Sequence, residues 1–285
     1  MLWRGEPLID GLTAALVFGQ RGRIAPDTAR LFRNSGVMHF LAISGLHVAI
    51  FAGIVMWLLL AAGVRPWTRA AVLIGVVWLY VVFTGAHTSA LRAGCMVTLA
   101  AAAPLVGRRH DLVSSLAAAA LIILLLDPTA LFGAGFQLSF AAVWAILYLY
   151  RGLSRILWPW RGFLERAQDE EERSPLRDAW VWGRGALLLA GCAWLATAPL
   201  NTAHFNRVSL LGPLLYVLLS PLVVPLLVCS LGVAALCLVG LPAGWLAWVT
   251  TLLGTRITEL LRLASAVPGF VHFTAGPPWW WVGMF

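Results

Sequence analysis

The sequence predicts an all-α membrane protein, a polytopic bundle of about seven to nine transmembrane helices, some broken or re-entrant, with amphipathic helices at the membrane surface. Of its 285 residues, 61% are hydrophobic and only 11% are charged. The mean hydropathy is +0.86, so the composition excludes an ordinary soluble enzyme. Several apolar runs approach the ~20 residues that a helix needs to cross the hydrocarbon core.

Residues 1–36 are predicted to form an external interfacial helical segment. Pro26 is typical of a helix start, and Gly36 would stop that helix. On it, Leu31 and Phe32 are expected to face the membrane, while the neighbouring arginines face the lipid headgroups.

Residues 37–285 are predicted to form one transmembrane channel domain. Six candidate spans are 37–62, 67–84, 88–106, 112–126, 130–150 and 185–200. Pro128 follows the end of the fourth span, because proline cannot continue a helical hydrogen-bond ladder. Residues 208–239 contain three prolines and are expected to form either one broken span with a re-entrant half or two short spans. Residues 250–266 form the last helix.

Arginine in the loops predicts the orientation. All 20 basic residues are arginine, and the connections after the first, third and fifth spans hold many of them, whereas those after the second and fourth hold none. The positive-inside rule places the arginine-rich connections in the cytoplasm, including the charged loop 151–184. The protein is therefore expected to be a multi-pass protein of the cytoplasmic (inner) membrane. The acidic run 169–172 is expected to be solvated linker, with a docking segment as the alternative.

Ser44, Gly45 and His47 lie in the first predicted span. A titratable side chain there is unfavourable unless it faces the bundle interior or a water-filled path. A glycine beside a serine also lets a second helix approach closely. We therefore expect these residues to pack against a helix or line a path. An intramembrane enzyme using Ser44 and His47 is a weaker alternative, because a nucleophile and its base usually come from different elements.

Arg92 is predicted about one turn into the third span, after a polar turn that contains His87 and Ser89. An arginine at the centre of a membrane helix costs ~2.5–3.5 kcal/mol, so it should face a partner or an aqueous path. The alternative is that it snorkels to the external headgroups. Gln137 and Ser139 in the fifth span are expected to line the same path, with interhelical hydrogen bonding as the alternative.

The polar groups inside the spans are neutral or cationic, which favours an anionic passenger. Asp127 lies at a span end and Glu259 in the last helix, whereas a cation-coupled carrier usually holds its ion with buried carboxylates. No cofactor or metal is expected, because the cysteines form no CxxC pair and the histidines do not cluster. Soluble-enzyme motifs are also missing.

The last helix carries a polar stripe, formed by Thr251, Thr255, Thr258 and Arg262. Their spacing places them on one helical face. Such a helix either lies on the membrane surface or lines a water-filled passage, and the first is favoured.

Residues 39–48, HFLAISGLHV, resemble a signature of the ComEC-type competence proteins. Similar blocks follow in the same order, at residues 83–85 and 89–93, 127–128, 135–142, and 198–200 with 204–205, and residues 18–21 precede them. The resemblance covers nearly the whole chain, and its ordered combination is more specific than any single block.

This resemblance implies a channel that moves single-stranded DNA across the cytoplasmic membrane during natural transformation. In that family an OB-like domain commonly precedes the channel domain, and a nuclease-like domain often follows it. Neither is expected within these residues, so no enzyme activity is expected of this chain. The implied partners are single-stranded DNA, membrane lipid, a periplasmic DNA receptor, a cytoplasmic ATPase and a separately encoded OB or nuclease module; a homo-oligomer is left open. The alternative function is a carrier or flippase for a small anionic solute or lipid.

Overall fold

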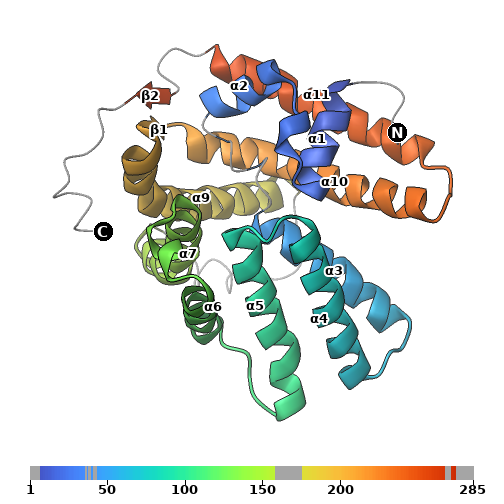
Figure 1. Cartoon of the computed structure of the whole chain (residues 1–285). Coiled ribbons are helices and arrows are strands. Elements are labelled where there is room, and N and C mark those ends of the chain that lie inside the picture. The colour runs from blue at the N-terminus through green and yellow to red at the C-terminus, as the bar shows by residue number, and fades with distance from the viewer. Residues whose placement is uncertain are drawn as a thin grey trace.

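A computed structural model describes residues 7–35, 37, 40, 44–157, 175–266 and 271–273, which are almost entirely helical (Figure 1). The α-helices are α1 (Pro7–Phe18), α2 (Pro26–Asn34), α3 (Gly45–Ala61), α4 (Pro66–Phe83), α5 (Thr88–Ala102), α6 (Leu112–Leu126), α7 (Ala134–Leu157), α9 (Pro175–Phe205), α10 (Gly212–Leu238) and α11 (Gly244–Ser265). Short 3-10 helices are η1 (Arg21–Arg23), η3 (Ala103–Val106) and η4 (Pro128–Phe132), and two strands are β1 (Arg207–Ser209) and β2 (Val271–Phe273). The predicted all-α class is confirmed.

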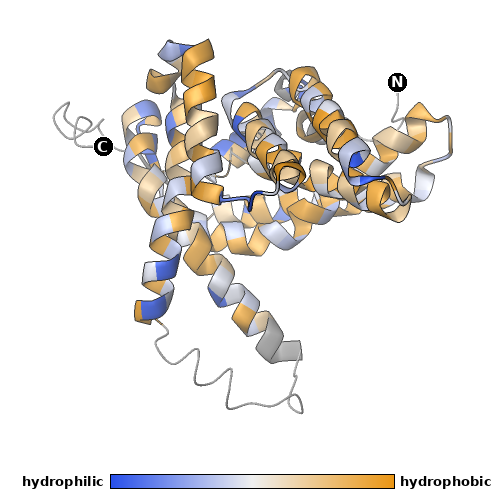
Figure 2. Cartoon of the chain, turned by 90° about the horizontal axis from the view of Figure 1, so that it is seen from below, coloured by the Kyte–Doolittle hydropathy of each residue, from blue (hydrophilic) through white to orange (hydrophobic). Residues whose placement is uncertain are grey.

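In the described part of the chain, five helices are long and apolar enough to cross a membrane. They are α4, α5 with η3, α7, α9 from Ala179, and α10, and the shorter helices α3 and α6 are apolar as well. Large apolar side chains such as Trp57, Leu79 and Leu125 are exposed, and Figure 2 shows hydrophobic residues along most helices. Exposed apolar surface of this kind is what a lipid environment requires.

Two clusters of buried apolar side chains lie in two separate groups of helices. In the first group, α1 and α2 pack against α10 and α11; in the second, α3, α4 and α5 pack on one another. The antiparallel helices α7 and α9 connect the groups, because α7 contacts α5 and α9 contacts α10.

The predicted orientation of α2 is wrong. Phe32 is only 3% exposed and belongs to the core formed with α10 and α11, and Leu31 packs against the same core. Because α10 and α11 cover this apolar face, it does not point into lipid. The arginines Arg30 and Arg33 do lie on the exposed face.

The first predicted span begins too early. Helix α3 starts at Gly45, while Val37 and Phe40 belong to the core beside α10 and α11. Ser44 precedes the helix with an extended backbone, φ −100° and ψ 168°, as expected of a residue at a helix start. Continuous hydropathy from residue 37 conceals this boundary. Ser44 therefore caps the helix and Gly45 is its first residue.

Neither predicted arrangement of residues 208–239 is correct, because α10 is one continuous helix through Pro221 and Pro225. A proline at 221 has no N–H to offer the carbonyl of Val217 four residues earlier. The Ser220 hydroxyl donates a hydrogen bond to that carbonyl at 3.2 Å. Serine side chains can satisfy backbone groups that prolines leave free in membrane helices, which explains how the helix continues.

Helices α7 and α9 extend into the predicted loop 151–184. Helix α7 continues to Leu157 and α9 begins at Pro175, so both ends of that range are helical. The acidic run 169–172 lies outside the described residues. Beyond α9, β1 pairs antiparallel with β2, and Trp194 Nε1 donates to the Ser209 carbonyl at 2.7 Å. The hydropathy pattern of the sequence did not predict this small sheet.

Helix α6 begins with an acidic cap. The Asp111 carboxylate accepts a hydrogen bond from the Ser114 backbone N–H at 2.7 Å. Hydrogen bonds from the Ser114 side chain and backbone hold the pKa of Asp111 below its usual value. Such a cap fixes the first turn of the helix.

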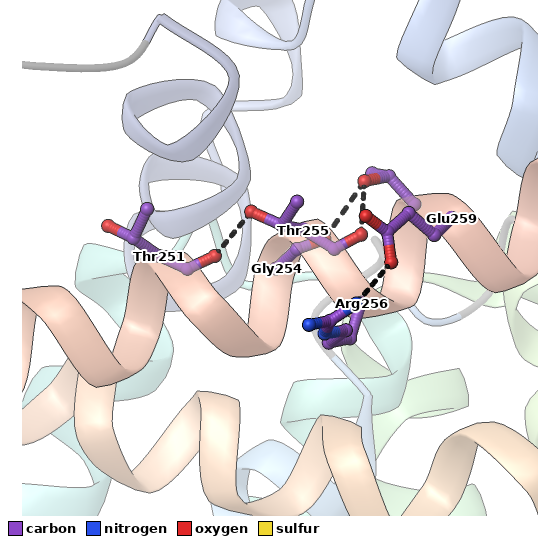
Figure 3. A network of polar contacts seen from close by, with 6 residues as sticks. Thr251, Gly254, Thr255, Arg256 and Glu259 are labelled. Carbon is purple, nitrogen blue, oxygen red and sulfur yellow. Dashed lines mark hydrogen bonds and ion pairs between the residues drawn. The ribbon is translucent and has the colours of Figure 1, made fainter.

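The polar stripe on α11 does not form one water-facing surface. Thr258 is only 2% exposed, and α11 packs against α10 and α2. The Thr255 hydroxyl donates to the Thr251 carbonyl at 2.7 Å, and Arg256 pairs with Glu259 at 2.9 Å (Figure 3). Because the threonines are satisfied within their own helix, the stripe is no evidence for a water-filled passage.

Candidate functional site around Arg92

A tight turn sets the position of Arg92. Gly85 and Ala86 both have positive φ, +91° and +47°, a conformation that glycine adopts at little cost. They reverse the chain after α4, so α5 begins at Thr88 and packs back against α4. Arg92 follows about one helical turn later.

Arg92 points into the helix bundle. Its side chain is only 7% exposed, and its Nη1 donates a short hydrogen bond to the backbone carbonyl of Ser139 on α7. The guanidinium also lies 5.7 Å from the centre of the Phe140 ring, a cation–π distance. The snorkelling alternative is therefore wrong, because the side chain contacts a neighbouring helix and not the headgroup region.

The charge of Arg92 is unbalanced among the described residues. No described carboxylate forms an ion pair with it; the short helical pairs Arg30–Asp27 and Arg256–Glu259 lie on other helices. Its Nε is buried and has no hydrogen-bond partner. A buried charge normally requires a pairing charge or a full set of hydrogen bonds. The Arg92 guanidinium therefore still has a hydrogen-bond donor to offer.

Gly45 makes room for the Arg92 guanidinium. A Cβ at residue 45 would lie 2.6 Å from Arg92 Nη2 and 3.6 Å from the Ala93 Cβ. Any larger residue would force the guanidinium to move. Gly45 therefore lets the start of α3 approach α5 at this point, as the sequence predicted for close helix packing.

Ser44 and His47 form a local cap on α3. The Ser44 backbone N–H donates to His47 Nδ1 at 3.2 Å, and the Ser44 Oγ lies 2.8 Å from the same nitrogen. Because Nδ1 accepts, the proton of the neutral imidazole lies on Nε2. His47 is only 2% exposed, and its Nε2 has no partner. The pair caps a helix, a simpler role than that of a nucleophile and its base.

The amino-terminal ends of α3, α5 and α7 lie together. Gly45 on α3 meets Arg92 on α5, and a Cβ at Gly135 on α7 would lie 3.5 Å from the Thr88 Oγ1 at the start of α5. Arg92 in turn reaches Ser139 on α7. Each helix start carries partial positive charge, so this end of the bundle is electropositive.

Among the other predicted residues, Gln137 bonds to α9 and not to Arg92. Gln137 Nε2 donates to the Leu131 carbonyl at 3.0 Å, and its Oε1 lies 2.7 Å from His204 Nε2 on α9. This is the interhelical bonding that the sequence left as an alternative. His87 is exposed in the turn before α5, and Ser89 is half-buried in its first turn.

Sequence reasoning missed the role of Phe140 and of the Ser139 backbone. Phe140 stacks on Phe136, with ring centres 4.3 Å apart, beside the guanidinium. An aromatic residue four positions after another suggests a stacked pair, but its contact with an arginine on another helix needs the structure. No group of three or more potential metal ligands occurs among the described residues, and all four cysteines are free.

Comparison with known proteins places this chain in a family. A family model described as Competence protein matches residues 16–285. Curated relatives include ComE operon protein 3 of Bacillus subtilis (strain 168), 34% identical over 48% of this chain, and Competence protein ComA of Neisseria gonorrhoeae, 29% identical over 70% of it. The matches span only 18% and 28% of those two proteins, and no solved structure matches. The chain belongs to the Competence protein family, as its sequence blocks predicted.

Proposed function

We propose that this chain forms a path for single-stranded DNA across the cytoplasmic membrane during natural transformation. The observation that carries the proposal is Arg92, a buried arginine without a carboxylate partner among the described residues, where α3, α5 and α7 meet. In a member of the Competence protein family, an unbalanced cation inside the bundle supports an anionic passenger.

Phosphate is the part of DNA that such a group would bind. Single strands are generally held by a cationic groove together with aromatic side chains on which bases stack. Arg92 supplies the first feature, and the stacked pair Phe136–Phe140 lies beside it. Arginine also suits phosphate because its planar fork donates two parallel hydrogen bonds.

Among the described residues, no carboxylate forms an ion pair with Arg92. Asp127 bonds to Thr129 at the start of η4, and Glu259 pairs with Arg256 on α11. Neither carboxylate forms an ion pair with Arg92. This distribution supports an anion path and disfavours a carrier for cations.

The partners belong to the proposal as well. From the arginine-rich loops we expect the start of α5 to lie on the external side. The strand would then reach Arg92 from a periplasmic DNA receptor and leave toward a cytoplasmic ATPase. Membrane lipid surrounds the apolar faces. An OB or nuclease module on a separate chain, or further copies of this chain, would complete the system.

Uptake by vesicles tests the function directly. The full chain is reconstituted into vesicles of phosphatidylethanolamine and phosphatidylglycerol, and the entry of fluorescent dT30 and of inorganic phosphate is measured. We expect dT30 to become protected from external nuclease, and Arg92→Gln to abolish that protection. Arg109→Gln is the matched control, because Arg109 is exposed in the loop before α6.

The second candidate is a carrier for a small anion, favoured by the single-arginine geometry of the site. One result would replace the first proposal with the second. In it, phosphate enters the vesicles in an Arg92-dependent way, but dT30 is not protected even when a DNA-translocating ATPase is added. Protection of dT30 that is equal in the wild type and in Arg92→Gln would remove Arg92 from the path.

A further inference from the structure

The start of α3 and the guanidinium of Arg92 are two positive groups held against each other. Arg92 Nη2 lies so close to Gly45 that a Cβ there would be only 2.6 Å away. The first N–H groups of a helix have no carbonyl partner within the helix, and they carry the positive end of its dipole. The positive helix start repels the buried guanidinium unless an anion binds to both groups.

Two unpartnered polar atoms strengthen this reading. Arg92 Nε and His47 Nε2 are both buried without a hydrogen-bond partner, and their side chains are more than nine-tenths buried. They come from the two elements that meet at Gly45, namely α5 and the first turn of α3. Buried polar atoms are rarely left unsatisfied in native structures, so each of these N–H groups is able to take an acceptor.

We propose that this junction binds one phosphodiester group of the strand at its half-buried edge, where the first turn of α3 and the guanidinium of Arg92 meet. The inference rests on the proposed function and adds the way in which the strand is recognised. Backbone N–H groups at a helix start and an arginine fork both suit phosphate oxygens. Ser44 and Gly45 are only half-buried, so the junction has an edge that a ligand can reach.

Gly45 is the positioning residue of this site. It contributes no side chain to the site, and its lack of a Cβ allows the guanidinium to lie against the helix start. An alanine at 45 would push the guanidinium away while leaving both binding groups chemically intact. Since phosphate and not the base is held, recognition is independent of nucleotide sequence.

Binding of two matched probes tests the inference. Fluorescein-labelled dT8 and its uncharged methylphosphonate analogue are titrated against the full chain in nanodiscs of phosphatidylcholine. Gly45→Ala is compared with Gly53→Ala, because Gly53 lies on the same helix with open space at its Cβ. Arg92→Lys keeps the charge and removes the planar fork. Thermal unfolding of each variant shows whether it is folded.

We expect Gly45→Ala and Arg92→Lys each to weaken dT8 binding by about tenfold or more. Tenfold is about the smallest loss expected when one hydrogen bond to a charged group is removed. Gly53→Ala should bind like the wild type, and the analogue should not distinguish the variants. The inference is overturned if folded Gly45→Ala binds dT8 like the wild type, or if the analogue binds as tightly as dT8. Should Gly45→Ala not fold, Arg92→Lys decides the outcome by the same criteria.

The same variants separate this site from the proposed function. Vesicles containing Gly45→Ala that protect dT30 as well as the wild type would refute the site and leave the transport proposal standing. A chain that binds dT8 in the expected pattern, but never protects dT30, would keep the site and refute transport.

Discussion

Arg92→Gln should remove function while changing stability little. Glutamine keeps a polar side chain of moderate length but removes the charge and the guanidinium fork. The wild-type side chain donates to the Ser139 carbonyl and lies over the Phe140 ring. Both contacts are lost in the variant, and so is the need to bury a charge.

The magnitudes of these effects nearly cancel. A hydrogen bond from a charged group contributes about 1.5–3 kcal/mol, the cation–π contact about 0.5–2 kcal/mol, and placing the arginine in a membrane helix costs about 2.5–3.5 kcal/mol. The Ser139 carbonyl also lies within α7, where the helical ladder supplies it with another donor. We therefore expect the free energy of unfolding to change by less than about 2.5 kcal/mol in either direction.

Two assays on the same variant test this reasoning. Thermal unfolding of the purified chain in dodecyl maltoside micelles reports stability, and transformation frequency in a host strain that depends on this chain reports function. We expect the unfolding temperature to stay close to that of the wild type and transformants to fall by roughly tenfold to a hundredfold, the range for losing one hydrogen bond to a charged group.

The reasoning would be refuted by the opposite pattern. A large loss of stability would mean that Arg92 is a structural link between α5 and α7. Normal transformation by a folded Arg92→Gln chain would show that the cation is not needed for DNA to pass. Arg109→Gln provides the control for the loss of one positive charge outside the bundle.

Three further predictions concern packing, interhelical bonding and pH. Gly94→Leu should destabilise the protein by about 1–3 kcal/mol by overpacking α5 against α4, where a Cβ would lie 3.3 Å from the nearest side chain; Gly75→Leu, which meets open space, should have little effect on the unfolding temperature. A double-mutant cycle between Gln137→Leu and His204→Phe should give a coupling free energy near 0.6 kcal/mol in the unfolding assay, with only a small change in DNA uptake. Asp111→Ala should lower the stability fully at neutral pH, because the ionised carboxylate, whose pKa is lowered in the folded state, stabilises the helix start. The difference in stability between the variant and the wild type should disappear in unfolding curves measured as the pH falls below about 3.9, the ordinary pKa of aspartate.

Hydropathy together with helix stop signals predicted much of the fold. The predicted span 112–126 has the same bounds as α6, where Asp111 and Pro128 bracket the apolar run. The span 67–84 differs from α4 by one residue at each end. These boundaries coincide with capping residues and prolines, which can be recognised directly in the sequence.

Other boundaries depended on interactions that hydropathy does not register. Ser44 starts α3 in the middle of an apolar run, through a hydrogen bond to His47. The hydroxyl of Ser220 allows α10 to continue past Pro221. Phe32 looked lipid-facing because an amphipathic helix on a membrane and one on a protein core have the same pattern.

The candidate site was predicted one residue at a time, and the structure supplies the grouping. Gly45 and Arg92 are distant in the sequence, and only tertiary packing places them in contact. Gln137, which the sequence grouped with them, bonds instead to His204. Phe140 had no signal of its own, because one phenylalanine among many in apolar helices does not indicate a cation partner.

The central claim, that DNA passes beside Arg92, is tested most directly by crosslinking a strand during transport. A biotinylated dT40 is stalled by streptavidin in membranes whose chain carries p-benzoylphenylalanine in place of Phe140, or in place of exposed Trp57 on α3. We predict crosslinks between the strand and position 140 and none at position 57. Stalled strands that crosslink equally at both positions, or at neither, would contradict the account.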